Sequence, residues 1–118
     1  MNDKSSKVTE RAYAFSLDII RLYQHIRSQN EFVLSKQVLR SGTSIGANIE
    51  EASAAQSRKD FIAKMSVASK EARETLYWLR LLRDSSICTE KELAGTIEES
   101  EQIIKMLTAI VKTTQAKN

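Results

Sequence analysis

RSGTSIGANIEEA, residues 40–52, decides the fold, because it holds two of the three glycines in a chain that contains no proline. Gly42 and Gly46 lie four residues apart among small polar side chains. A Walker-type phosphate loop would need a strand before the glycines and a lysine after them, and the sequence offers neither. Each glycine inside a helix costs on the order of 1 kcal/mol relative to alanine. We therefore predict that the stretch is helical and that its glycines mark close approach to neighbouring helices.

The apolar pattern on both sides of this stretch is also helical. Apolar residues recur at steps of three and four, which is typical of amphipathic helices in a bundle, and no sustained alternation favours a β-strand. The predicted helices span about residues 6–28, 35–55, 58–84 and 90–114. Short turns between them indicate a single all-α domain over residues 1–118, an antiparallel up-down-up-down four-helix bundle.

Each predicted helix has one apolar seam that should face the core. Three short polar motifs should start the later helices: Ser35 as an N-cap, Ser57 with Asp60, and Thr89 with Glu92 as a capping box. The predicted seams are Val8, Ala12, Phe15, Ile19, Leu22 and Ile26; Leu34, Val38, Ser41, Ile45, Ile49 and Ala52; Phe61, Met65, Ala68, Ala72, Leu76, Leu79 and Leu82; and Leu93, Ile97, Ser100, Ile104, Leu107 and Val111.

Composition limits the class of protein. With 118 residues, 42% hydrophobic and 28% charged, the chain can bury a core of its own. No apolar run is longer than four residues, as at 12–15, which is too short to span a bilayer, and the first ten residues do not form a secretory signal. The single cysteine, Cys88, fits a reducing compartment. We expect a cytoplasmic protein that does not associate with membranes.

Side chains that could support catalysis are scattered along the sequence. His25 is the only histidine, Cys88 has no histidine near it in sequence, and Glu98, Glu99 and Glu101 point in different directions on one helix. A di-metal bundle site would need Glu-x-x-His pairs on two helices. We therefore expect no enzymatic activity, no metal and no cofactor.

The third helix carries the main functional signal. Residues 58–84 contain seven basic and four acidic residues, although the net charge of the whole chain is only +3. A basic stripe that includes an aromatic residue can combine phosphate contacts with base stacking, which makes it a candidate nucleic-acid site. The alternative is an ordinary solvated helix face, because acidic residues interleave with the basic ones. The candidate residues are Lys59, Lys70, Arg73, Tyr77 and Arg80.

Several apolar residues lie outside the predicted seams. A bundle of this size does not need them all in its core, so they indicate a surface for self-association. Within the opening stretch, Asn48 and Glu51 have two open interpretations. They could be a register-fixing amide beside a solvated carboxylate, or they could contact basic groups on another helix or subunit. The off-seam residues are Tyr13, Ile20, Tyr23, Ile62, Val67, Tyr77 and Trp78.

RSGTSIGANIEEA, with SRKDFIAKMSVASKEARETLYWLRLL at residues 57–82, resembles a bacterial family of four-helix bundles that includes proteins encoded in intervening sequences of 23S ribosomal RNA genes. The resemblance covers roughly residues 8–112. Where many relatives read Ala-Glu-Gly, this chain has Glu-Glu-Ala at residues 50–52. The family-signature residues carried over, with an interface role, are Arg40, Ser44, Asn48 and Glu51.

This resemblance implies a homopentameric ring around a central channel, without established enzymatic activity. A similar fold serves as the accessory protein of diversity-generating retroelements, which binds nucleic acid and a reverse transcriptase. The expected partners are therefore further copies of the chain, and RNA or a nucleic-acid-processing protein. We expect a non-enzymatic oligomeric bundle that binds RNA through the basic face of its third helix. The alternative is a protein-interaction scaffold or accessory subunit with no nucleic-acid role.

Overall fold

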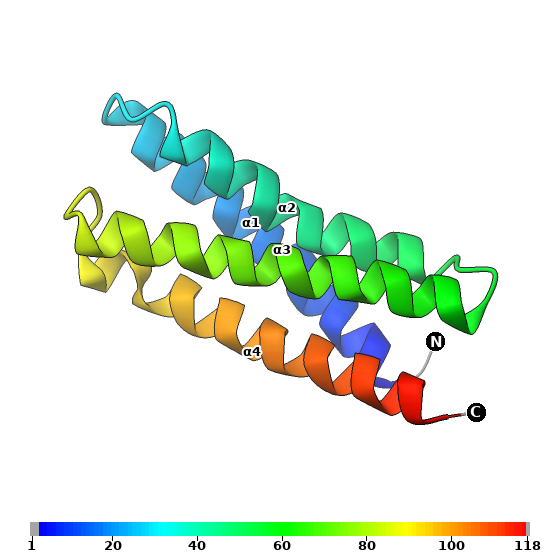
Figure 1. The fold of residues 1–118 in the computed structure, drawn as a ribbon. Coiled ribbons are helices and arrows are strands. Elements are labelled where there is room, and N and C mark those ends of the chain that lie inside the picture. Colours follow the sequence, from blue (N-terminus) through cyan, green and yellow to red (C-terminus); the bar gives the residue numbers. More distant parts are fainter. Residues whose placement is uncertain (1–2, 118) are drawn as a thin grey trace.

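The computed structural model describes residues 3–117, with side chains from residue 6 onward, and these residues form four helices and no strand. The helices are α1 (Asp3–Ser28), α2 (Leu34–Ala52), α3 (Arg58–Asp84) and α4 (Glu90–Ala116). Consecutive helices run antiparallel, so both ends of the chain lie at the same end of the bundle (Figure 1). The predicted all-α, up-down-up-down architecture is confirmed.

The four helices pack as a square. α1 packs against α2 and α4, and α3 packs against the same two helices from the opposite corner. The bundle measures 49 × 20 × 18 Å, so it is two helices wide in each direction and every helix keeps an outward face. None of the four helices within residues 3–117 combines the length and apolarity that crossing a bilayer requires.

The seams predicted for α1 and α2 form their core faces. Phe15 and Ile19 of α1 are buried in the same core as Ile45 and Ile49 of α2, and only Leu22 and Leu34 at one end of these seams are partly exposed. Burying side chains of this size contributes about 1.5–3 kcal/mol each. The core therefore follows directly from the sequence pattern in the first half of the chain.

In α3 the predicted seam is wrong at one position. Thr75 is buried and Leu76 is not, because the core face at this level turns toward α2. The Thr75 hydroxyl oxygen lies 2.8 Å from Ser41 Oγ and 2.8 Å from the carbonyl of Glu71. This buried hydroxyl pair satisfies the polar groups that the α2–α3 contact removes from water.

The predicted seam of α4 is also displaced by one residue in its second half. Ile103 and Ile110 are buried, whereas Ile104 and Val111 are only partly buried. All four are apolar, because α4 contacts both α1 and α3 and needs a wide apolar surface. An apolar pattern with spacings of three and four residues could not predict which of two adjacent apolar residues is buried in the core.

The glycine prediction is confirmed most clearly at Gly42. A Cβ atom built there would lie 2.8 Å from Cγ1 and Cγ2 of Ile19 on α1, which is closer than real Cβ contacts. At Gly46 the nearest atom would be Ser16 Oγ at 3.4 Å, which is ordinary contact. The Ile19 side chain therefore fills the space beside Gly42, whereas at Gly46 the backbone carbonyl of Ala12 on α1 lies nearby, at 3.6 Å.

Two of the three predicted helix starts are confirmed. Ser57 accepts a hydrogen bond from the amide of Asp60, and Thr89 with Glu92 forms a complete capping box. Ser35 is not an N-cap, because it lies in the first turn of α2 and is fully buried. Its hydroxyl donates to the carbonyl of Glu31 at 2.8 Å instead.

Glu31 provides the cap that Ser35 was expected to form. Its carboxylate accepts from the amides of Val33, Leu34 and Ser35 at 3.3, 3.0 and 2.8 Å. Burial raises the pKa of Glu31, but these three hydrogen bonds outweigh it and hold the pKa below its usual value.

The predicted helix ends at residues 28, 58, 84 and 90 match the structure, and the others differ from the prediction by a few residues. α2 ends at Ala52 rather than near residue 55, and the amide of Ser53 closes its last turn. α1 begins at Asp3 rather than near residue 6, and α4 continues to Ala116 rather than 114. Helix ends depend on local capping contacts, which periodicity does not encode.

Candidate nucleic-acid interface

All five basic-stripe residues predicted on α3 are exposed, but they do not share one site. Arg73, Tyr77 and Arg80 line the same surface hollow, and Lys59 lines another toward the start of the helix. Lys70 is exposed but does not line these hollows. The structure therefore brings four of the five residues to the boundary between α3 and α4.

Three shallow hollows follow one another along that boundary, which we call the α3–α4 groove. The hollow at the start of α3 has a volume of about 380 Å³, the middle one about 250 Å³ and the one toward Arg80 about 350 Å³. Arg73 lines both the second and the third hollow, so these two adjoin at its side chain. In Figure 1 α3 and α4 lie side by side over their whole length.

The α3–α4 groove is strongly basic. Glu101 is the one acidic side chain among the residues that line its three hollows. Such an excess of cations along one line concentrates anionic ligands. The basic lining residues are Arg58, Lys59, Arg73, Arg80, Lys105, Lys112 and Lys117.

Two of these cations, Lys105 and Lys112, come from α4 and were not predicted from the sequence, and Lys117 is the C-cap of the same helix. Lys105 shares a hollow with Arg73 and Arg80, and Lys112 shares the adjacent hollow with Arg73. Their seven-residue spacing was a readable signal, because it puts both on one helix face. Only the packing of α4 against α3 shows that this face adjoins the basic stripe.

The groove cations lack carboxylate partners. Among the side chains described, from residue 6 to 117, no ion pair involves Arg73, Arg80, Lys105 or Lys112. Arg73 donates from Nη2 to Thr108 Oγ1 at 3.3 Å, which draws its guanidinium across to α4. These charges therefore remain available to an external anion.

Several basic residues outside the groove are paired with nearby acids. Arg11 on α1 forms two hydrogen bonds with Glu99 on α4, at 2.8 and 2.6 Å. Arg21 pairs with Asp18 at 2.9 Å. Unlike the groove residues, these cations are part of the bundle's own electrostatics.

The family-signature residues lie on a different boundary, between α2 and α3. Arg40 forms ion pairs with Glu71, at 3.3 Å, and with Glu74. Trp78 Nε1 also donates to Glu74, at 3.1 Å. One arginine on α2 thus fixes two carboxylates and, through one of them, the indole of α3.

The remaining signature residues have mixed roles. Glu51 contacts α3, since its Oε1 lies 2.8 Å from Lys64 Nζ. Asn48 does not reach another helix in these contacts: its amide donates to the carbonyl of Ser44 at 2.9 Å, within α2. The cross-helix interpretation therefore holds for Glu51, whereas Asn48 bonds to Ser44 of its own helix.

His25 and Cys88, two of the residues considered for catalysis, lie near the α3–α4 turn. His25 Nε2 lies 2.7 Å from Glu92 Oε2, and Glu92 is also the capping-box acid of α4. Cys88 is 2% exposed; burial raises the pKa of its thiol, and the charge of Glu92 raises it further. The His25–Glu92 contact and the burial of Cys88 make both residues part of the structure around the turn.

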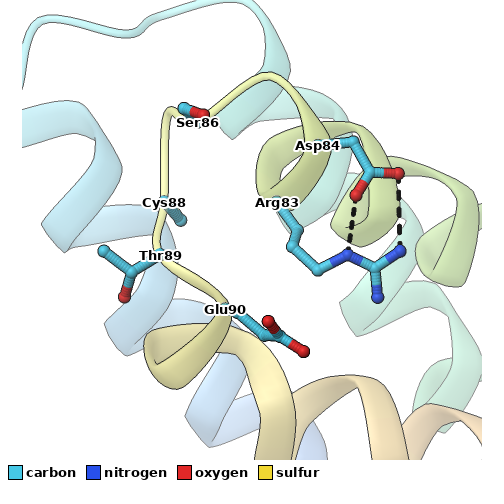
Figure 2. A pocket seen from close by; sticks show the side chains of 6 residues that line it. All are labelled: Arg83, Asp84, Ser86, Cys88, Thr89 and Glu90. Atoms are coloured by element: carbon cyan, nitrogen blue, oxygen red, sulfur yellow. Dashed lines mark hydrogen bonds and ion pairs between the residues drawn. The ribbon is translucent and has the colours of Figure 1, made fainter.

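Figure 2 shows the hollow beside this turn, which has a volume of about 370 Å³. Arg83 folds onto the carboxylate of its neighbour Asp84, with Nε to Oδ1 at 2.8 Å. Arg83 is the only basic residue that lines the hollow, and its ion pair with Asp84 neutralises its charge. Among the described residues no three His, Cys, Asp or Glu side chains gather as a metal site would require.

The fold and surface define a class: a small four-helix bundle with a basic groove between two of its helices. Residues 4–109 match the family model of the 23S rRNA-intervening sequence protein. The chain belongs to that family, and the resemblance found in the sequence is confirmed.

A solved structure supports the same assignment. The chain is 47% identical to a protein of unknown function from the S23 ribosomal protein family of Bacteroides thetaiotaomicron VPI-5482, with a TM-score of 0.89. The match covers 92% of this chain and 98% of that one. No curated protein matches the chain.

Proposed function

We propose that this protein is a non-enzymatic RNA-binding module whose α3–α4 groove contacts the phosphate backbone. The observation that carries the proposal is the groove itself, in which basic residues from two helices face a single acid. Lysine and arginine contacts to phosphate release counterions and supply most of the sequence-independent affinity for nucleic acid. Membership of a family named for a 23S rRNA intervening sequence makes RNA the anion to test first.

Self-association is the second part of the proposal. Tyr13, Leu17 and Ile20 are 63%, 40% and 38% exposed and follow each other along the outer face of α1. Such a stripe on a small domain favours an interface between copies of the chain. We propose a homo-oligomer, with the pentameric ring as the expected form. Several grooves in one ring would also raise the avidity for a long RNA.

A scaffold that binds only proteins is the competing function. The same α1 stripe favours it, because an apolar surface can dock a foreign partner as well as another copy of the chain. The groove separates the two functions, since a pure scaffold gives unpaired cations between α3 and α4 no role.

The salt dependence of RNA binding tests the proposal. We expect the full chain to bind labelled RNA at 50 mM salt, with affinity falling log-linearly as salt rises. The double variant Arg73→Glu, Arg80→Glu should bind at least about 10-fold more weakly. Its log–log salt slope should be shallower by about 1.4 to 1.8, because two phosphate contacts are lost.

The matched control is Lys7→Glu, Arg21→Glu, which changes the net charge equally at two exposed positions of α1. It should leave the salt slope unchanged. The proposal fails if the native chain binds no RNA at 50 mM salt, or if the control loses as much affinity as the groove variant.

A further inference from the structure

The α3–α4 groove also offers apolar surface. The hollow that contains Arg73 and Arg80 is lined by the aliphatic side chains of Leu76 and Ile104 as well. Tyr77 lines the same hollow and is 52% exposed. Its ring packs edge-on against Trp78, with centroids 5.3 Å apart, and this contact holds one edge of the ring while much of the side chain stays open.

Phosphate contacts alone do not distinguish RNA duplexes from single strands, but an exposed ring does. In an A-form duplex the bases are stacked inside, and the helix presents mainly phosphates and 2′-hydroxyls to a protein. An aromatic side chain therefore gains stacking energy only from an unpaired base. Leu76 and Ile104 would likewise contact bases more favourably than phosphates.

The one acidic residue of the groove lies at the same place. Glu101 lines the hollow that contains Tyr77, and its carboxylate repels phosphate. Carboxylate oxygens can only accept hydrogen bonds, and both base N–H groups and the 2′-hydroxyl of RNA can donate them. The acid is thus misplaced for a backbone contact and suited to a nucleoside contact.

The basic residues continue on both sides of this nucleoside-compatible hollow. Lys59, Arg73 and Arg80 follow one another along α3, and the first and last are 21 residues apart, which corresponds to about 32 Å of helix. Lys105 and Lys112 flank that line from α4. An extended strand could follow these cations with its backbone while one base lies beside Tyr77.

We infer that the α3–α4 groove takes single-stranded RNA, with the backbone on the lysine and arginine residues and an unpaired base stacked on Tyr77. This inference rests on the proposed function and adds the strandedness of the ligand. Tyr77 acts as a stacking residue, and Glu101 accepts a hydrogen bond from the same nucleoside.

The test compares two ligands that share one labelled strand. A 12-nucleotide RNA without self-complementarity is titrated with the full chain at 50 mM salt, alone and then annealed to its complement. We expect the single strand to bind more tightly than the duplex. The variant Tyr77→Leu should lower the single-strand affinity by about 5- to 100-fold, because one stacked base is lost, and leave duplex affinity unchanged.

Tyr13→Leu is the matched control, since Tyr13 is an exposed tyrosine on α1 away from the groove. It should leave both affinities unchanged, and circular dichroism should show native helicity for both variants. Tyr77→Phe keeps the ring and should retain the affinity for the single strand.

The outcomes separate this inference from the proposed function. A duplex that binds as tightly as the single strand, with its affinity dependent on Arg73 and Arg80, would overturn the inference and leave RNA binding standing. An unchanged single-strand affinity in Tyr77→Leu would have the same meaning. Binding of neither ligand at 50 mM salt would overturn both.

Discussion

Gly42 and Gly95 occupy opposite kinds of position within helices of the same bundle. A side chain at Gly42 would collide with Cγ1 and Cγ2 of Ile19, whereas a Cβ at Gly95 would meet nothing within 4 Å. The Ile19 atoms branch directly from its Cβ, so they cannot easily rotate away. The same substitution should therefore have opposite signs at the two sites.

We predict that Gly42→Ala destabilises the protein by about 1–3 kcal/mol, because it overpacks the α1–α2 contact. Gly95→Ala should stabilise it by up to about 1 kcal/mol, because an exposed helical glycine is replaced by the best helix former. Urea unfolding followed by circular dichroism measures both. A stabilising Gly42→Ala would contradict the close approach of α1 and α2.

At the scale of single residues, the sequence predicted the role of Gly42 correctly and the role of Ser35 wrongly. Gly42 could be found because a glycine inside a helical pattern needs a compensating contact. Ser35 was misassigned as a cap because serine is favoured both at helix starts and in small buried spaces. Glu31, four residues earlier, caps the helix instead, because its carboxylate accepts hydrogen bonds from the amides of Leu34 and Ser35.

At the scale of helices, the start of α2 depends on one carboxylate. The folded state holds the pKa of Glu31 below its usual value, so the stabilisation is complete above the unfolded pKa of about 4.3. It is lost as the pH falls through the lower, folded pKa, because protonation removes the charge that accepts the amide hydrogen bonds.

We therefore predict that Glu31→Gln destabilises the protein at pH 7 by about 0.5–2 kcal/mol, the usual effect of losing a helix cap. The difference from the native chain should narrow as the pH is lowered from 5 toward 2. Urea unfolding over this pH range measures it. Glu50→Gln, at an exposed glutamate of α2, is the control and should show little effect. A constant difference across the pH range would contradict the charged cap.

The sequence predicted where the helical segments lie, but not which residues of each helix face the core. Steps of three and four located all four helices within a few residues of their ends. The choice of Thr75 over Leu76 for the core could not be read from this pattern, because adjacent positions differ by only about 100° around a helix. Packing against two neighbours settled it.

At the scale of the whole molecule, α1 keeps an apolar outer face in a narrow bundle. We predict that light scattering will give a mass above the 13.3 kDa of one chain, and five times that value for the proposed pentamer. Leu17→Lys, in the middle of the exposed α1 stripe, should reduce the mass toward one chain while keeping helicity.

Lys36→Ala, at an exposed polar position of α2, is the control and should not change the mass. A native chain that remains monomeric at micromolar concentration would contradict self-association. An oligomer that survives Leu17→Lys would place the interface on another face.

The sequence by itself determined the fold class, the helical segments and the family, because periodicity, helix caps and small-residue spacing are local properties of the chain. It also identified the basic stripe of α3. Tertiary structure alone decided that Lys105 and Lys112 of α4 join this stripe, that Lys70 lies apart from it, and that Glu101 and Tyr77 line one hollow. The physical reason is that a groove belongs to two helices, and their mutual rotation is set by packing across the core.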